Sequence, residues 1–308
     1  MSKNLNEFLI AIRAYNEAKN LPKLIKEIKK LGYKNILIVD DSSTDNTKEV
    51  INDLKKEFPD LLYVRHIQNT NMGGALLTEF KVAKKMNKHL ITLDGDLQHN
   101  PKDIKNFLEI NKFDVILGNR YLTKNKVPIF RKILHNLNTL FNLILNRKKI
   151  NDVHNGFRAY NKKVLDLFIK ELHYFDGSYA DNITYIISKY KLNFIEVPTT
   201  IKYSEETLKK GQKVHKTFLK ILLRSFLLRF FSRKKLFVLS FILSFFINAI
   251  VFSFYSFFNK GFIIFLILNF FLVFALIYMS LIMWYKKVLE EKKLKNLISE
   301  ISIEKYLK

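Results

Sequence analysis

The sequence predicts an α/β domain with a mostly parallel sheet, followed by a smaller membrane-associated region. Over roughly the first two hundred of its 308 residues, short apolar runs of strand type alternate with segments of helical period. Residues 236–285 are instead almost uninterruptedly apolar and rich in phenylalanine. A chain of this length can bury one sizeable core and still carry an appendage.

The expected strands and helices follow one another in the order of a doubly wound sheet. The run FLIAI is the first strand, and Pro22 suits the first turn of the helix that follows. The segments SSTDNT and QNTNMGG are expected to be loops. The pattern continues through the strand ILIVDD, helix 48–58, the strand LLYVRHI, helix 75–85 and the strands HLITLDGD and FIEVP.

Polar segments follow the ends of these strands. In open α/β sheets, ligands bind in the crevice beyond the carboxyl ends of the strands. We therefore expect one crevice to be lined by four segments, RAYNE, DDSSTD, NMGG and DGDLQ.

The segment DGDLQ carries a candidate metal site. Gly95 lets the chain turn sharply between Asp94 and Asp96, and Gln98 follows closely. Hard oxygen ligands at this spacing suit Mg²⁺ or Mn²⁺ bridging two phosphates of a nucleotide. A pair of surface aspartates after a strand also commonly forms an Asx turn, so the motif alone leaves both interpretations open.

The formal net charge of +24 suits either nucleic acid or an anionic membrane surface as partner. Many of the basic residues lie between positions 202 and 235, directly before the apolar region, which favours a membrane over nucleic acid. The chain has no cysteine, which excludes disulfides, a thiolate zinc site and a cysteine nucleophile. Its amino terminus does not resemble a signal peptide, so we expect the polar domain to be cytoplasmic.

The apolar region is long enough for two membrane spans. Residues 236–258 and 262–285 each exceed the length of about 20 residues that crosses a bilayer. Lysines flank both ends, which places those ends in the cytoplasm; a buried hairpin of a soluble protein is the alternative. The expected divisions are a catalytic domain at 1–212, an amphipathic interfacial helix at 213–233, a transmembrane hairpin at 234–287 and a charged tail at 288–308.

Six motifs in this order and spacing resemble one family. The segments are AYNEAKNLPKLI, VDDSSTDNT, MGGALLTEFKVAK, LDGDLQHNPKDI, GNRY and NGFRAYNKKVL. Together they resemble the polyprenyl-phosphate branch of family 2 glycosyltransferases, relatives of dolichyl-phosphate mannose synthase, from about Phe8 to about Lys202. The resemblance implies a GT-A fold and inverting transfer of a sugar from a UDP- or GDP-linked donor to a polyprenyl or dolichyl phosphate.

The resemblance also implies roles for individual residues. Asp94, Asp96 and Gln98 would serve the metal, with Asp96 and Gln98 the direct ligands. The acidic side chains of the donor site can accept hydrogen bonds from ribose or base, although Asp40 and Asp41 also suit a turn or helix cap. The donor would contact Ala14, Tyr15, Asn16, Glu17, Asp40, Asp41, Asp94 and Gly95.

On the acceptor side, the resemblance implies that Arg120 contacts phosphate and that Arg131, His135 and Arg158 belong to the acceptor site. Arginine suits phosphate because its planar fork pairs with two oxygens. Asp152 is our candidate for orienting or deprotonating the acceptor, and a structural hydrogen bond to the Gly156 turn is the alternative. The chain departs from the family pattern at three positions, where it has Arg13 for proline, His135 for a small hydroxyl residue and Asn155 for serine or cysteine.

Other functions remain open on sequence alone. The acceptor could be a protein, a glycan or a glycerolipid, although a neutral hydroxyl would need a base more than paired cations. Two alternatives lie outside this reaction. One is a catalytically silent scaffold that binds a nucleotide-sugar, and the other is a nucleotidyltransferase. The sequence does not identify the sugar or the nucleotide, and it leaves open whether copies of the chain assemble through the hairpin.

Overall fold

The computed structural model describes the polar domain. The described residues are 5–123, 136, 139, 140, 143, 148–172 and 179–202. The predicted interfacial helix, hairpin and tail lie outside them, as do Arg131 and His135. None of the helices formed by the described residues is long and apolar enough to cross a membrane. The membrane architecture therefore stays a prediction.

One sheet of seven strands organises this domain, in the order β3-β2-β1-β4-β6-β5-β7. Strands β1 to β4 are mutually parallel, as predicted, and β7 is parallel to β5. Strand β6 runs antiparallel between β4 and β5. The bounds are β1 Phe8–Ala14, β2 Ile36–Asp40, β3 Leu62–Arg65, β4 His89–Asp94, β5 Val115–Asn119, β6 Arg158–Tyr160 and β7 Phe194–Pro198.

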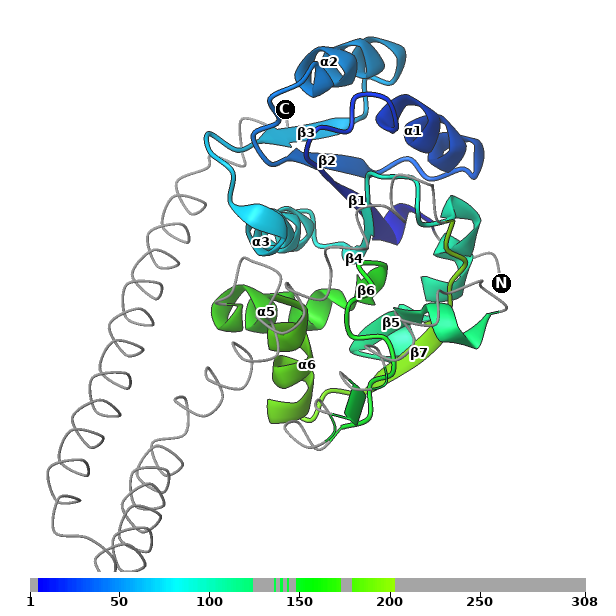
Figure 1. Cartoon of the computed structure of the whole chain (residues 1–308), viewed down its shortest axis with the longest axis vertical. Coiled ribbons are helices and arrows are strands. Elements are labelled where there is room, and N and C mark those ends of the chain that lie inside the picture. The colour runs from blue at the N-terminus through cyan, green and yellow to red at the C-terminus, as the bar shows by residue number, and fades with distance from the viewer. Residues whose placement is uncertain are drawn as a thin grey trace, which may run out of the picture. The chain divides into compact units, whose positions relative to one another are not determined.

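Helices cover both faces of the sheet (Figure 1). Side chains alternate along β1: Leu9 and Ala11 pack with α3, α5 and α6, whereas Ile10 and Ile12 pack with α1, α2 and η2. Because both faces are buried, the strand is apolar at nearly every position. The helices are α1 Leu21–Lys30, α2 Thr47–Glu57, α3 Asn71–Lys85, α5 Leu165–Glu171 and α6 Tyr179–Lys189, and the longest 3₁₀ segment is η2 Pro101–Phe107.

Helix α3 begins at Asn71, so the segment NMGG, predicted as a loop, forms its first turn. The residue before it, Thr70, donates hydrogen bonds to Asp41 from its backbone N–H (2.7 Å) and its hydroxyl (2.8 Å). These contacts to the end of the second strand determine where the helix starts. The sequence predicted a loop because asparagine and glycine are typical of loops. The contact between Thr70 and Asp41 is long-range, so local composition does not reveal it.

Three aromatic rings join α3 to the rest of the core. Phe80 lies against Phe168 with ring centroids 5.3 Å apart, and its edge meets Tyr160 at 4.8 Å. The rings therefore connect α3, α5 and β6, and all three side chains are fully buried. Such contacts add to the free energy of burying the rings themselves.

Replacing Phe80 with alanine should lower the free energy of unfolding by about 3–5 kcal/mol, because the cavity lies at the junction of three elements. Urea titration of the full chain in detergent, with proteolysis reporting the folded fraction, measures this loss. Ile67, which is 86% exposed, is the control. Its change to alanine should cost under about 0.5 kcal/mol, and an equal loss for both variants would contradict the assignment of Phe80 to the core.

Candidate active site

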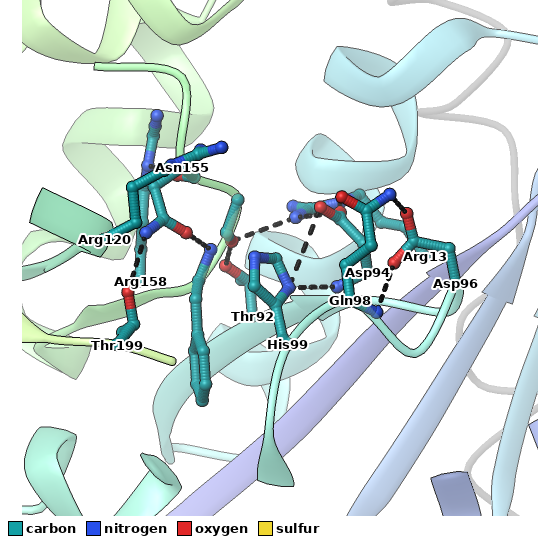
Figure 2. A network of polar contacts seen from close by, with 12 residues as sticks. Arg13, Thr92, Asp94, Asp96, Gln98, His99, Arg120, Asn155, Arg158 and Thr199 are labelled. Atoms are coloured by element: carbon teal, nitrogen blue, oxygen red, sulfur yellow. Dashed lines mark hydrogen bonds and ion pairs between the residues drawn. The ribbon is translucent and has the colours of Figure 1, made fainter. Parts of the chain in front are cut away.

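The predicted crevice lies beyond the carboxyl ends of the parallel strands. β1 ends at Ala14, β2 at Asp40 and β4 at Asp94, and the loop before β6 reaches the same edge because β6 runs in the opposite direction. Figure 2 shows the polar side chains that this arrangement gathers, with the Asp94–Gln98 turn beside Arg13, and with Arg120 and Arg158 across from it. The acidic turn is therefore surrounded by three arginines, Arg13, Arg120 and Arg158.

Asp94 is held by an arginine from the neighbouring strand. Arg13 and Asp94 are paired in the register of β1 with β4. Arg13 Nη2 and Nε donate to the same oxygen, Asp94 Oδ1, at 2.8 Å and 3.2 Å. Burial opposes ionisation of Asp94, but the charge and hydrogen bond of Arg13, together with His99 and Arg158, outweigh it and hold the pKa of this carboxyl below its usual range. The carboxylate predicted to serve the metal thus has a positive partner inside the protein.

The carbonyl of Gly156 completes this contact. It accepts hydrogen bonds from Arg13 Nη2 (3.1 Å) and from the Thr92 hydroxyl (2.8 Å). A Cβ at this position would lie 2.5 Å from Asp94 Oδ2 and 2.9 Å from Arg13 Nη2. The segment NGFR therefore needs glycine because the Arg13–Asp94 pair presses against its backbone.

Asp96 faces the crevice from a strained turn. Leu97 has φ of 60°, a left-handed conformation that a leucine rarely adopts. This turn brings Gln98 back, so that its backbone N–H donates to Asp96 Oδ1 (3.0 Å) and its amide to Asp96 Oδ2 (2.5 Å). Burial, together with the negative charges of Asp94 and Glu17, raises the pKa of Asp96 to about 6. A cation beside Asp96 would relieve this repulsion.

The residues present fit a divalent cation that is completed by substrate. Among the described residues, no three His, Cys, Asp or Glu side chains gather closely enough to hold a metal by themselves. Magnesium is commonly held by one or two carboxylates together with substrate phosphates and water. Asp96 supplies a carboxylate, and rotation of the Gln98 amide would turn its oxygen to the same point. Asp94, predicted alongside them, is instead engaged by Arg13.

The predicted donor residues of the first loop join two neighbouring loops. Asn16, with φ of 59°, receives a hydrogen bond from Thr44 N–H on Oδ1 (2.8 Å), and its own N–H donates to the Ser43 hydroxyl (2.9 Å). Glu17 lies beside the Gly95 backbone, close to the acidic turn. Tyr15, which follows Ala14 at the end of β1, is 47% exposed. This loop thus meets the second loop and leaves an aromatic face open.

Asp40 and Asp41 are buried and engaged within the protein. Asp40 accepts from Ser43 N–H at 2.8 Å and from Arg65 Nη1 at 2.5 Å. Asp41 Oδ1 accepts from Thr70 and lies 2.7 Å from His66 Nδ1. Their exposures are 0% and 5%. Asp40 thus holds the turn to Ser43, whereas Asp41 joins the end of β2 to Thr70 and His66; donor contact by either residue stays a prediction.

Asp152 orients Arg120. Its Oδ2 accepts from the backbone N–H of Arg120 at 2.9 Å and from the guanidinium Nε at 2.7 Å. Glu196 of β7 fixes Asp152 in turn, by accepting from its backbone N–H at 3.1 Å. Asp152 is 4% exposed, and Asn155 Nδ2 approaches the same oxygen at 3.3 Å. This buried carboxylate therefore holds an arginine in place through Oδ2.

Arg158, predicted for the acceptor site, lies inside the NGFR segment. It is 3% exposed, and its guanidinium donates to the carbonyls of Asn155 (2.8 Å) and Val153 (2.5 Å). The structure therefore brings Asp96, Gln98 and Arg120 to the crevice, and it places Arg158 behind them as a support for the loop. Buried backbone carbonyls need hydrogen-bond donors, and Arg158 supplies them here.

His99 and the segment after β7 close one side of the turn. His99 Nδ1 accepts from Asp94 N–H (3.3 Å), and its ring lies against Phe157 with centroids 5.2 Å apart. Lys202 N–H donates to the Gln98 carbonyl (3.0 Å), so the segment TTIK passes directly beside the acidic turn. In the sequence, a single histidine next to the motif carries no spacing signal that would reveal this position.

Comparison with known proteins agrees with this geometry. The family model described as Glycosyl transferase family 2 matches residues 9–168. The chain is 31% identical to an uncharacterized protein of Methanocaldococcus jannaschii, over 68% of this chain and 88% of that protein. It is 28% identical to the UDP-N-acetylglucosamine–dolichyl-phosphate N-acetylglucosaminyltransferase of Methanococcus voltae, over 67% of this chain and 89% of that protein.

A solved structure supports the fold. Glucosyl-3-phosphoglycerate synthase from Mycobacterium tuberculosis, in complex with Mn²⁺, UDP and phosphoglyceric acid, matches with a TM-score of 0.52 at 12% identity. The match covers 71% of this chain and 78% of that one. The predicted GT-A fold is confirmed for the domain.

Replacing Gly156 with alanine should lower turnover of a nucleotide-sugar by about 100-fold, because the new methyl group displaces the Asp94 carboxylate and the Arg13 guanidinium. Steady-state kinetics of the full chain measure the effect. Gly32→Ala is the matched control, since its Cβ would meet only Leu5 Cδ1 at 3.8 Å, although φ of 88° costs stability. Normal turnover in Gly156→Ala would show that the contact is dispensable.

Proposed function

This chain belongs to glycosyltransferase family 2, and we propose that it transfers a sugar from a nucleoside diphosphate to the phosphate of a polyprenyl or dolichyl phosphate, with inversion. The observation that carries the proposal is the acidic Asp96–Gln98 turn opposite Arg120 (Figure 2). Asp152 holds this arginine by accepting a hydrogen bond from its guanidinium. One side suits the cation and diphosphate of a donor, and the other suits a phosphate. Two anionic groups can therefore be held in one crevice.

His99 lies between the two sides. Burial lowers the pKa of its ring, while the charge of Asp94 raises it and the charge of Arg120 lowers it. Figure 2 shows the His99 ring between Arg120 and Asp94, so the ring is exposed to charges from both sides of the crevice. This proximity matters because an attacking phosphate and a leaving diphosphate must meet at the same sugar carbon.

On the donor side, Asp96 and Gln98 would hold Mg²⁺ or Mn²⁺ together with the donor diphosphate. When bound, the cation neutralises charge on the leaving nucleoside diphosphate. Tyr15 offers its exposed face at the end of β1, and Asn16 and Glu17 hold the surrounding loops together. We propose that the nucleoside occupies this part of the crevice.

On the acceptor side, Arg120 would align the lipid phosphate. Such a phosphate is already largely ionised near pH 7, because its second pKa is about 6, so it can attack without a strong base. This agrees with the engagement of Asp152 by Arg120, and we propose that Asp152 positions Arg120 and does not remove a proton. Arg131 and His135, outside the described residues, are proposed to extend the acceptor site. The relative from Methanococcus voltae is named for transfer to dolichyl phosphate.

The membrane hairpin belongs to the same proposal. A polyprenol chain is costly to remove from a bilayer, at about 0.8 kcal/mol for each buried CH₂ group, so the catalytic site has to approach the membrane. Two spans at 236–258 and 262–285 would anchor the chain, with residues 213–233 as a helix in the interface and the catalytic domain in the cytoplasm. The protein would then take its donor from the cytoplasm and its acceptor from the membrane.

The reaction is tested by offering a panel of radiolabelled UDP- and GDP-sugars to the full chain with undecaprenyl or dolichyl phosphate in detergent. We expect label in a phosphate-linked lipid, only with Mg²⁺ or Mn²⁺, and at least about 100-fold less label with Asp96→Asn. Asp53→Asn, on the exposed face of α2, should behave as the unmodified chain.

The same assay separates the rival functions. Label that enters a protein, a glycan or a glycerolipid, and not a lipid phosphate, would replace the proposed acceptor. Binding of a nucleotide-sugar without transfer to any acceptor would indicate a silent scaffold. Release of pyrophosphate from a nucleoside triphosphate would indicate a nucleotidyltransferase.

A second prediction concerns the role of Asp152. Asp152→Asn should lower kcat by about 100-fold, and Arg120→Ala with Asp152→Asn should lower it no further than Arg120→Ala alone, because the two residues act as one unit. The pH dependence of kcat should keep its shape in Asp152→Asn. Asp114→Asn is the control, since Asp114 accepts from Asn193 N–H at 2.9 Å on an exposed surface. Loss of the acidic limb of the pH profile in Asp152→Asn, where the base must lose its proton, would instead identify Asp152 as the base.

A further inference from the structure

A buried cluster of charges lies behind the acidic turn. Arg13 of β1 is 7% exposed and Glu79 of α3 is fully buried, with Arg13 Nη1 3.3 Å from Glu79 Oε2. The other end of the guanidinium binds Asp94 Oδ1 at 2.8 Å and the Gly156 carbonyl at 3.1 Å. The guanidinium of Arg13 on β1 thus connects α3, β4 and the loop before β6.

This cluster is costly for the protein to keep. Glu79 Oε1 has no hydrogen-bond partner, and burial raises the pKa of Glu79 to about 7 although Arg13 opposes the shift. Burying ionised groups costs free energy. Replacing a buried ion pair with apolar side chains of similar size often leaves a protein equally stable or more stable. The cluster is therefore better explained by what it does to Asp94 than by a contribution to stability.

What it does to Asp94 follows from the contacts. Two donors of Arg13 converge on Oδ1, and the Gly156 backbone packs closely against both carboxylate oxygens. Asp96 lies two residues further along, where Gln98 is its hydrogen-bond partner. The two carboxylates of this short motif thus have different surroundings. Asp94 is paired with the charge of Arg13, whereas Asp96 is directed to the crevice.

We propose that Arg13, oriented by Glu79, is a positioning residue that keeps Asp94 from binding the cation and leaves Asp96 as the carboxylate ligand of this turn. The inference rests on the proposed function, because it concerns the cation that accompanies the donor. The buried charges of Arg13, Glu79 and Asp94 thus determine how strongly the acidic turn attracts a cation.

The first test compares the two aspartates in the otherwise unmodified chain. Mn²⁺ binding to the full chain in detergent is measured by electron paramagnetic resonance, with and without UDP or GDP. Asp96→Asn should weaken Mn²⁺ binding by about 100-fold or more, whereas Asp94→Asn should change it less than about threefold. Equal losses in both variants would show that Asp94 is a direct ligand and would overturn the proposal.

The second test removes the internal counter-charge. Arg13→Met combined with Glu79→Met exchanges the buried ion pair for apolar side chains and so avoids stranding Glu79. The side chain of Asp94 is 22% exposed, so it can turn to the crevice once its partner is gone. Mn²⁺ affinity without nucleotide should then rise about tenfold, while kcat for sugar transfer falls.

Adding Asp94→Asn to this double variant should abolish the gain in Mn²⁺ affinity, which a merely structural role of Arg13 would not produce. Lys29→Met, which removes an ion pair with Asp60 far from the crevice, should leave Mn²⁺ binding and transfer unchanged. A fall in kcat with unchanged Mn²⁺ affinity in the double variant would overturn the proposal. If the double variant does not fold, the comparison of Asp94→Asn with Asp96→Asn still decides.

These outcomes are separable from failure of the proposed function. If the unmodified chain transfers no sugar to a lipid phosphate, the reaction proposed above is wrong, whatever the variants bind. If it transfers sugar but Asp94→Asn loses Mn²⁺ as Asp96→Asn does, the positioning role of Arg13 is wrong and the reaction stands.

Discussion

The ion pair between Arg13 and Asp94 is the interaction on which the crevice depends. It joins two adjacent parallel strands at the edge where they end, and the Gly156 carbonyl accepts from the same guanidinium. Because burying any one of these groups alone would be costly, each requires the others to be in place. The loop before β6, far away in the chain, is thereby attached to the motif at the end of β4. The geometry of the site is thus a property of the assembled sheet.

The remaining acidic residues follow the same rule. Asp40 and Asp41 lie at the end of β2, and their carboxylates accept hydrogen bonds from Arg65 and Thr70. The carboxylate of Asp152 accepts one from Arg120. In each case a buried carboxylate is satisfied by groups distant in sequence, and the loop that carries it becomes rigid. Asp96 differs, because its partner Gln98 belongs to the same turn. A carboxylate with a local partner can exchange that partner for a charged ligand without disturbing the neighbouring loops.

Sequence reasoning predicted β1 to β4, their parallel arrangement and the convergence of their loops, since long apolar runs and turn residues are local signals. Strands β5 and β6 were not predicted. Strand β6 has only three residues, and its antiparallel direction depends on pairing with both neighbours. The orientation of Asp41 depends on Thr70 and His66, which no local pattern reveals. Arg13 was noticed only as a departure from proline, because its partners Glu79 and Gly156 come from other elements. Arg131 and His135 stay predictions.

The contact between Arg120 and Asp152 has a meaning for how this protein can diversify. The two residues bracket the part of the chain that runs from η4 (Arg120–Leu122) toward β6, and their hydrogen bonds close it at its base. A segment closed at its base can change length at little thermodynamic cost, because the entropy of loop closure grows only slowly with size. Exchange of this segment between relatives would therefore leave the half that carries Asp96 undisturbed. Under the proposed function, exchange between these two fixed points would change the acceptor side, while Asp96 and Gln98 keep their places.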